Sequence, residues 1–216
     1  SCSPLLRTEV MPAAFSRSVL LPRPQHGEAE RVQMGRAEIV LENRRGSYSL
    51  LWSNGRESKR YVLGLTDQGH LSIELCAPRY PLACMPREAM TLVPGARLRG
   101  YVTVPLVPTV IWRTRPDSPE RLLELLPLEL EGVWTEAAGH AFRVPVTWMT
   151  RFPFAGAEPH CVVPVRLKNA SDAVLSPGQL DISVQDSDLI EMRGTMVVRP
   201  KRITLHASVD DGEAEA

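Results

Sequence analysis

The chain has 216 residues, 44% of them hydrophobic, so it is long enough to form one large or two small domains with a buried core. Its 25 basic residues balance its 25 acidic residues, which argues against nucleic acid as a partner because phosphate binding rests on concentrated positive charge. No apolar run approaches the roughly 18–20 residues of a membrane span. We therefore expect a soluble protein without a transmembrane segment, located in the cytoplasm.

Charge is distributed unevenly along the chain. Residues 209–216 are mostly acidic, and we expect them to form a disordered tail. Basic side chains gather in the first third of the chain. We expect them to lie on solvated strand faces, and a weak anion-binding face is the alternative. This basic group consists of Arg36, Arg44, Arg45, Arg56, Lys59 and Arg60.

The four cysteines are too few for a disulfide scaffold. Cys76 and Cys84 flank one segment, so a disulfide between them is an alternative. We expect buried free thiols instead, which are common for cysteines in protein cores. The remaining two cysteines are Cys2 and Cys161.

The N-terminal part predicts an irregular lead-in followed by a hairpin. Residues 1–30 contain four prolines and little periodicity, and only Val19–Leu21 is expected to join a sheet. Apolar and polar residues then alternate in Arg31–Asn43 and again in Ser47–Ser53, which is the period of a half-buried strand. The turn between these two strands is expected at Arg44–Gly46.

The next two strands extend this hairpin. Asn54-Gly55 predicts a type I′ turn, because both residues tolerate a positive φ, and it leads into a strand at Arg60–Leu65. A further turn at Asp67–Gly69 leads into His70–Cys76, where the apolar residues share one face. Together these strands predict a four-stranded meander.

The segment Ala77–Arg87 interrupts this rhythm. Its prolines at positions 78, 81 and 86 cannot donate ladder hydrogen bonds, so we expect an extended loop or an edge segment. A hairpin is expected next, with strands at Thr91–Val93 and Arg97–Val104 around the Pro94-Gly95 turn. The apolar run continues to Trp112 with interruptions at two further prolines.

Arg115–Leu126 is the one place where a helix competes with a strand. Pro119 suits the first helical position after an N-cap, yet the leucines that follow also fit a buried strand, and the two structures are equally expected. Downstream, alternation indicates a strand at Leu128–Val133 and another at Phe142–Trp148.

The C-terminal part shows the clearest alternation. His160–Val184 contains two alternating stretches separated by polar turns, which predicts a pair of antiparallel strands. Strands are also expected at Ile190–Arg199 and Arg202–Ala207. The predicted fold is all-β, built from one or two antiparallel sandwiches with at most one or two short helices, and two immunoglobulin-like units in tandem are one arrangement of it. The expected division is a lead-in at 1–30, an N-terminal β unit at 31–114, a C-terminal sandwich at 115–208 and a tail at 209–216.

No motif of catalysis, metal binding or nucleotide binding is present. His160 and Cys161 are neighbours, so in a strand their side chains point to opposite faces and cannot share one metal ion. The acidic pairs Glu129/Glu131 and Asp186/Asp188 are expected to be solvated faces or turns. Asn169–Ser171 matches a glycosylation acceptor, but it is interpreted as a turn. We therefore expect no catalytic residue, no metal and no cofactor.

The aromatic residues leave one candidate contact site. The four tryptophans, at positions 52, 112, 134 and 148, each lie near a strand and are expected in the core, with exposure at an interface as the alternative. Tyr80 lies in the proline-rich segment beside Arg79 and Pro81, and these three residues are the predicted partner-binding site.

Three segments resemble a known family. CAPRYPLACMP at 76–86 and TLVPGARLRGYVTVPLVPTVIW at 91–112 are similar to the prokaryotic family catalogued as domain of unknown function number 432, as is VPVRLKNAS at 163–171. The chain departs from the family at 142–156, where FRVPVTWMTRFPFAG replaces an expected Tyr-Gly motif. The resemblance spans residues 33–203 and implies a mostly β fold, with no known activity and no known catalytic residues.

The expected function is therefore non-catalytic binding or assembly through a protein partner. This partner is either another protein or a membrane-associated complex. A hydrolase or metal-dependent enzyme built from dispersed residues such as His140, His160 and Asp188 is the first alternative. The second is a sandwich that binds a small ligand or a carbohydrate through exposed tryptophans.

Overall fold

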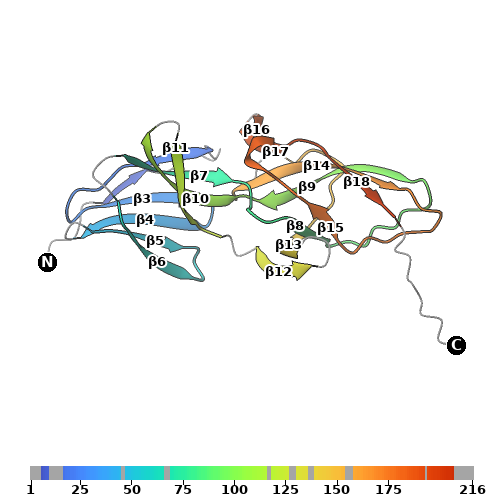
Figure 1. Ribbon diagram of the computed structural model, residues 1–216, viewed down its shortest axis with the longest axis horizontal. Helices are drawn as coiled ribbons and strands as arrows, with labels where there is room; N and C mark the ends of the chain where they lie inside the picture. The colour runs from blue at the N-terminus through green and yellow to red at the C-terminus, as the bar shows by residue number, and fades with distance from the viewer. Residues whose placement is uncertain are drawn as a thin grey trace.

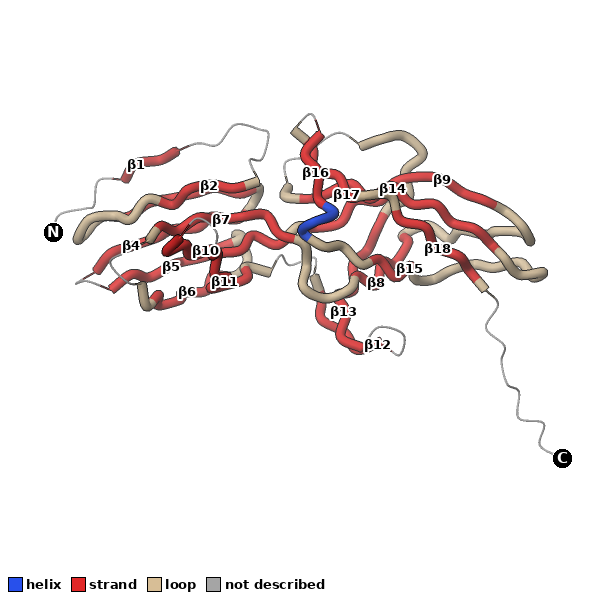
Figure 2. The backbone as a smooth tube through the Cα atoms, turned by 45° about the horizontal axis from the view of Figure 1, so that its top comes forward, coloured by secondary structure: helices blue, strands red, loops and turns tan. Residues whose placement is uncertain are grey.

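The structure is a computed structural model, and it describes residues 6–9, 17–44, 47–65, 69–115, 118–126, 130–135, 139–153, 158–192 and 194–206. These residues form eighteen β-strands and one 3-10 helix, η1 (Asp186–Asp188), so the predicted all-β class is confirmed. The strands form four sheets, which Figures 1 and 2 show as two groups placed end to end along the molecule.

The first group of sheets contains the first seven strands together with β10 and β11. One sheet has the order β1-β3-β4-β5-β6 and is antiparallel except for the parallel β1–β3 pair. The other has the order β11-β10-β7-β2 and is antiparallel throughout. These strands are β1 (Leu6–Glu9), β2 (Ser18–Leu21), β3 (Ala29–Met34), β4 (Ala37–Arg44), β5 (Ser47–Ser53), β6 (Ser58–Leu63), β7 (His70–Cys76), β10 (Val107–Arg115) and β11 (Ser118–Glu124).

The second group of sheets contains the remaining strands. One sheet has the order β12-β13-β8-β15, with a parallel β8–β13 pair at its centre. In the other sheet β14 pairs with β9 on one side and, on the other side, with β17 and β18, both parallel to it. These strands are β8 (Leu82–Pro86), β9 (Arg97–Pro105), β12 (Glu131–Thr135), β13 (Gly139–Val146), β14 (His160–Asn169), β15 (Leu180–Ile182), β16 (Leu189–Met192), β17 (Thr195–Val198) and β18 (Lys201–Leu205).

Alternation along the strands builds the core of both groups. In β4, Ile39 and Leu41 are fully buried, and in β7 Leu71 and Ile73 are fully buried on the facing sheet. Successive side chains of a strand point to opposite faces, so each of these pairs belongs to one inward face. The buried apolar residues of the two groups form one continuous cluster.

The chain passes between the two groups three times, which the predicted division at residues 114 and 115 does not anticipate. β8 and β9 fall within the predicted N-terminal unit but pair with β13, β15 and β14. β11 falls within the predicted C-terminal unit but pairs with β10. Alternation identifies a strand and its buried face, but it does not identify the neighbouring strand, so pairing between distant segments is invisible to it.

Three predicted elements are corrected by the strand pairing. Arg31–Asn43 is two strands rather than one, because a turn at Gly35, with φ of 58°, separates β3 from β4. The meander is β3–β6, since β7 pairs with β10 and β2 in the other sheet. The two alternating stretches of His160–Val184 do not pair with each other, because β14 lies in one sheet and β15 pairs with β8 in the facing one.

The predicted Asn54-Gly55 turn does join two antiparallel strands, but its loop spans four residues, 54–57. Gly55 has the positive φ expected of it, 83°. The Oδ1 atom of Asn54 accepts hydrogen bonds from the backbone N–H groups of Arg56 and Glu57 at 3.0 and 2.8 Å. Asparagine therefore stabilises this loop through its side chain as well as its backbone.

The expectation of a loop or edge segment at Ala77–Arg87 is correct for residues 77–81 and wrong for β8. β8 occupies the middle of its sheet between β13 and β15, and its first three residues are buried to within 1% exposure. The prolines at positions 81 and 86 lie just before β8 and at its last residue. Proline is tolerated where a strand begins or ends, so the four residues between them pair with β13.

Other expectations are resolved more simply. Val19–Leu21 joins a sheet as predicted, by pairing with β7. The lead-in at 1–30 is less irregular than expected, because it also contains β1 and the first two residues of β3. The competition at Arg115–Leu126 is settled in favour of a strand, β11, at a sheet edge where Pro119 is acceptable. The tail at 209–216 and the turn residues 45–46 and 66–68 lie outside the described residues. In the described part of the chain, no helix is long and apolar enough to cross a membrane.

Candidate functional site

The predicted contact residues lie where β7 leads into β8. Arg79 and Tyr80 are exposed, while Pro81 is half-buried and its carbonyl accepts a 2.8 Å hydrogen bond from the backbone N–H of Phe142. The guanidinium carbon of Arg79 lies 5.1 Å from the centre of the Tyr80 ring, a cation–π geometry. The structure therefore presents Arg79 and Tyr80 at the surface and uses Pro81 to join β8 to β13.

Strand pairing brings two further aromatic side chains to Tyr80. Trp134 of β12 lies directly opposite His140 of β13, and their rings are 4.8 Å apart at an interplanar angle of 87°. Phe142 pairs with Leu82 in the parallel β8–β13 ladder, so His140, two residues earlier, falls level with Tyr80. The rings of His140 and Tyr80 are accordingly 5.7 Å apart.

We call Tyr80, Trp134 and His140, together with Arg79, the aromatic surface. The aromatic surface lies beside the buried face of the same sheet. Phe142 is 5% exposed and its ring centre lies 5.5 Å from that of Tyr80, in an edge-on contact, whereas Trp134 is 72% exposed. Large aromatic side chains left in water are unfavourable in the isolated protein and common at the centre of interfaces. The aromatic surface is thus the part of this sheet face that the described residues leave exposed.

The edge of the sheet adds backbone groups to the aromatic surface. Among the described strands, β12 pairs with β13 alone, and Figures 1 and 2 show this hairpin projecting from the second group. In an antiparallel edge strand, every second residue turns its N–H and C=O groups outward. These groups can pair with an added strand.

Sequence reasoning placed two members of the aromatic surface elsewhere. Trp134 was expected in the core, where Trp52 and Trp112 do lie at 4% and 5% exposure and Trp148 is half-buried. His140 was considered only as a member of a dispersed catalytic or metal site. The available signal was the pair of glycines at 132 and 139, which flank Trp134 and mark a short hairpin at an edge.

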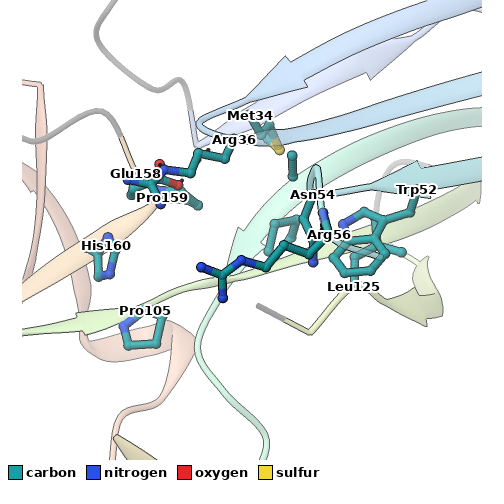
Figure 3. A pocket seen from close by; sticks show the side chains of 12 residues that line it. Met34, Arg36, Trp52, Asn54, Arg56, Pro105, Leu125, Glu158, Pro159 and His160 are labelled. Atoms are coloured by element: carbon teal, nitrogen blue, oxygen red, sulfur yellow. Dashed lines mark hydrogen bonds and ion pairs between the residues drawn. The ribbon is translucent and has the colours of Figure 1, made fainter. Parts of the chain in front are cut away.

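A cavity lies where the two groups of sheets meet. This junction cavity has a volume of about 300 Å³ and receives residues from the β3–β4 and β5–β6 turns, the β9–β10 connection and the start of β14. Figure 3 shows Arg36 and Glu158 on one side of it and Arg56 reaching toward Pro105 and His160. Its buried wall includes Met34, Trp52 and Leu125.

The dispersed candidates for an enzyme lie in different surroundings. His140 belongs to the aromatic surface, and His160 lines the junction cavity while Cys161 on the opposite face of β14 is buried. Asp188 accepts a 2.8 Å hydrogen bond from Lys201, which holds the pKa of its carboxyl below the usual range. No group of three potential metal ligands occurs in the ranges that the structure describes.

The acidic pair Asp186/Asp188 lies in the short turn η1, one of the two expected settings, and its carboxylates bond to other elements of the chain. The Asp186 carboxylate accepts a 2.6 Å hydrogen bond from the backbone N–H of Ala77 and forms an ion pair with Arg121 of β11. Arg121 belongs to the first group of sheets and Asp186 to the second. This ion pair therefore joins the two groups, as does the pair between Arg36 and Glu158 beside the junction cavity.

The three cysteines that the structure describes are structural, and Cys2 lies outside the described residues. Cys76, Cys84 and Cys161 are free and buried, so the alternative disulfide between Cys76 and Cys84 is wrong. Burial raises the pKa of Cys84 and of Cys161 to about 12. A raised pKa leaves almost no thiolate near neutral pH, and the thiolate is the reactive form.

We expect Cys84 and Cys161 to resist alkylation by iodoacetamide at pH 8 in the folded protein and to react fully in guanidinium chloride. Peptide mapping by mass spectrometry measures both states. Modification of either residue in the native protein at the rate of a free thiol would contradict their burial.

Comparison with protein-family models, with curated proteins and with solved structures found no match to the chain. The resemblance to family 432 therefore stays a prediction, and no residue role is transferred from another protein. Function is inferred from the aromatic surface and the junction cavity alone.

Proposed function

We propose that this chain is a non-catalytic binding protein that receives an extended segment of a protein partner on β12. The single observation that carries the proposal is Trp134, 72% exposed on an edge strand and in contact with His140, which in turn contacts Tyr80. An added strand would satisfy the outward backbone groups of β12, and its apolar or proline side chains would cover the three rings.

The ring geometry favours a peptide over a carbohydrate as the occupant. Trp134 and His140 meet edge-on at 87°, and His140 and Tyr80 are tilted by 41°, so the three rings form a stepped surface. A sugar ring stacks best on a flat aromatic face, whereas the separate side chains of an extended peptide fit a stepped one. Arg79 adds an exposed cation beside the rings, so an acidic residue next to the apolar ones would complete the match.

The test uses peptides selected from a random library for binding to the intact chain. Trp134→Ala should weaken the binding of a selected peptide by about 10-fold or more, because an exposed tryptophan at the centre of an interface is a typical hot spot. Tyr80→Ala and Arg79→Ala should weaken it less. Hydrogen exchange of the backbone amides of Glu131–Thr135 should slow when the peptide binds, since strand addition protects them.

The matched control is Val62→Ala. Val62 is 77% exposed on β6, which is also an edge strand but lies in the first group of sheets. Selected peptides should bind this variant as they bind the wild type. Binding that is insensitive to Trp134→Ala, or that protects β6 in place of β12, would refute the proposal, and so would a carbohydrate that binds through Trp134 while no peptide does.

A further inference from the structure

The junction cavity carries an inference that is independent of the aromatic surface. Its base is the point where β9 passes into β10, and Pro105 and Pro108 both line it. At Leu106 the backbone N–H is already bonded to the carbonyl of Pro159 at 2.8 Å, and prolines have no N–H to offer. At these three residues the chain therefore offers a ligand no free backbone donor, and the side-chain donors of the cavity become decisive.

The cavity contains one acid and two guanidinium groups, and only one of these cations is neutralised. The Nε atom of Arg36 lies 3.2 Å from Glu158, and the backbone N–H of Arg36 donates a 3.4 Å hydrogen bond to the other oxygen of the same carboxylate. The Arg56 guanidinium has no ion pair or hydrogen bond with any residue that the structure describes. The cavity consequently holds one positive charge that no described acid neutralises, and Arg56 is its unpaired donor (Figure 3).

A second donor is held ready next to Arg56. The Oδ1 atom of Asn54 is fixed by the two backbone N–H groups of its own turn, which sets the orientation of the amide. Its Nδ2 atom is buried and has no hydrogen-bond partner within the described part of the chain. An unsatisfied buried donor costs roughly 1–3 kcal/mol, a cost that a ligand oxygen would remove.

The remaining wall is apolar. Trp52 is 4% exposed, Leu125 is 2% exposed and Met34 is fully buried. A volume of about 300 Å³ lies at the small end of the range for ligand pockets. The cavity therefore suits a small molecule with a flat apolar body and one charged end.

We propose that the junction cavity binds a small organic anion, a carboxylate or a phosphate monoester on a flat apolar body. The oxyanion is held by the fork of the Arg56 guanidinium, with the Asn54 amide as the second donor, and the apolar body lies against Trp52 and Leu125. Arg36 stays paired with Glu158 and closes one side of the cavity. Because the cavity walls come from both groups of sheets, a ligand here would also hold these groups together.

The experiment measures binding of four probes by titration calorimetry, with the Trp52 indole signal followed by NMR. Benzoate and phenyl phosphate carry both the flat body and the oxyanion, phenol carries only the body, and inorganic phosphate carries only the oxyanion. We expect benzoate or phenyl phosphate to bind with Kd of about 1 mM or lower and to shift the Trp52 signal, with the other two probes at least about 10-fold weaker. The preferred member of the first pair identifies the ligand as a carboxylate or a phosphate.

Arg56→Ala should weaken the bound probe by about 10-fold, and Arg56→Lys should restore part of the loss because it keeps the charge without the fork. Arg56 is exposed and unpaired, so its removal leaves the fold intact. Arg99→Ala, at another exposed and unpaired arginine, is the matched control and should bind as the wild type does. Absence of binding by both aromatic anions, equal binding of phenol, or binding unaffected by Arg56→Ala would each overturn the proposal. Trp134→Ala should leave the affinity for the probe unchanged.

Discussion

Gly69→Ala is expected to lower the free energy of unfolding by about 3 kcal/mol, the sum of backbone strain and a steric clash. Gly69 has φ of 116°, a conformation that alanine rarely adopts. An added Cβ would lie 2.6 Å from the carbonyl oxygen of Arg113 and 2.7 Å from the indole of Trp112. The carbonyl belongs to β10, which is paired on both sides, so the backbone cannot move away cheaply.

Trp112 has no easy alternative position either. It is 5% exposed, and the guanidinium of Arg23 lies 4.5 Å over its ring while donating a 3.0 Å hydrogen bond to the carbonyl of Gly69. Displacing the indole would therefore disturb the cation–π contact and the hydrogen bond together. This is why the cost at Gly69 should exceed that of an ordinary glycine turn.

Two matched glycines separate strain from clash in a urea unfolding series. Gly27→Ala has a similar requirement for positive φ, 82°, but open space around the Cβ, so about 1 kcal/mol of strain is expected. Gly178→Ala has neither feature and should be close to neutral. A loss at Gly69 no larger than that at Gly27 would show that β10 and Trp112 adapt to the methyl group.

Alternation located most of the strands of this protein but few of their partners. The inward faces of β4, β7 and β14 follow directly from their period of two, and burial agrees with it. The β8–β13 pair was not predictable in the same way, because it joins segments about sixty residues apart and the prolines around β8 resemble those of a loop. Pairing depends on the packed sheet as a whole, which a local pattern does not encode.

The candidate sites likewise contain residues that the local sequence predicts and residues that only strand pairing brings together. Exposure of Arg79 and Tyr80 was expected from a proline-rich segment that interrupts the strands. The contribution of Trp134 and His140 depends on the parallel β8–β13 ladder, and the junction cavity depends on five chain segments that meet only in the fold. The sequence indicates an anion-binding face among the basic residues of the first third as an alternative to solvated strand faces. It does not show which arginine is available: in the structure Arg36 forms an ion pair with Glu158, whereas Arg56 has no ion pair with the described residues.

Asn169→Ala is expected to lower the free energy of unfolding by about 3 kcal/mol, because it removes the centre of a buried hydrogen-bond network. Asn169 is fully buried at the end of β14. Its Nδ2 atom donates to the carbonyls of Leu92 and Ala173 at 3.0 and 2.7 Å, and its Oδ1 atom accepts from the backbone N–H and the hydroxyl of Ser171 at 2.9 and 2.8 Å. The sequence reading of this segment as a turn is thus given a physical basis, since one side chain holds the turn together.

The backbone of Asn169 is tied to the same region. Its N–H donates to the carbonyl of Ala96, and its carbonyl accepts from the N–H of Gly95. Alanine would keep these two bonds but leave the backbone N–H of Ser171 without its partner, and the carbonyl of Leu92 would keep only its 3.0 Å bond from the N–H of Leu175. Leaving buried groups unpaired costs more than the net gain of the bonds themselves, so the loss should exceed that of an ordinary hydrogen bond.

Asn43→Ala is the matched comparison for this network. Asn43 is 8% exposed, its Nδ2 atom makes one 3.1 Å bond to the carbonyl of Pro24, and its Oδ1 atom is buried without a partner. Removing it should cost about 1 kcal/mol, since one bond is lost and one unsatisfied oxygen disappears with it. Urea unfolding with an unchanged m-value measures both variants. Equal losses of unfolding free energy for the two asparagine variants would mean that water replaces the Asn169 bonds. In that case a double-mutant cycle of Asn169→Ala and Ser171→Ala would show no coupling between these residues.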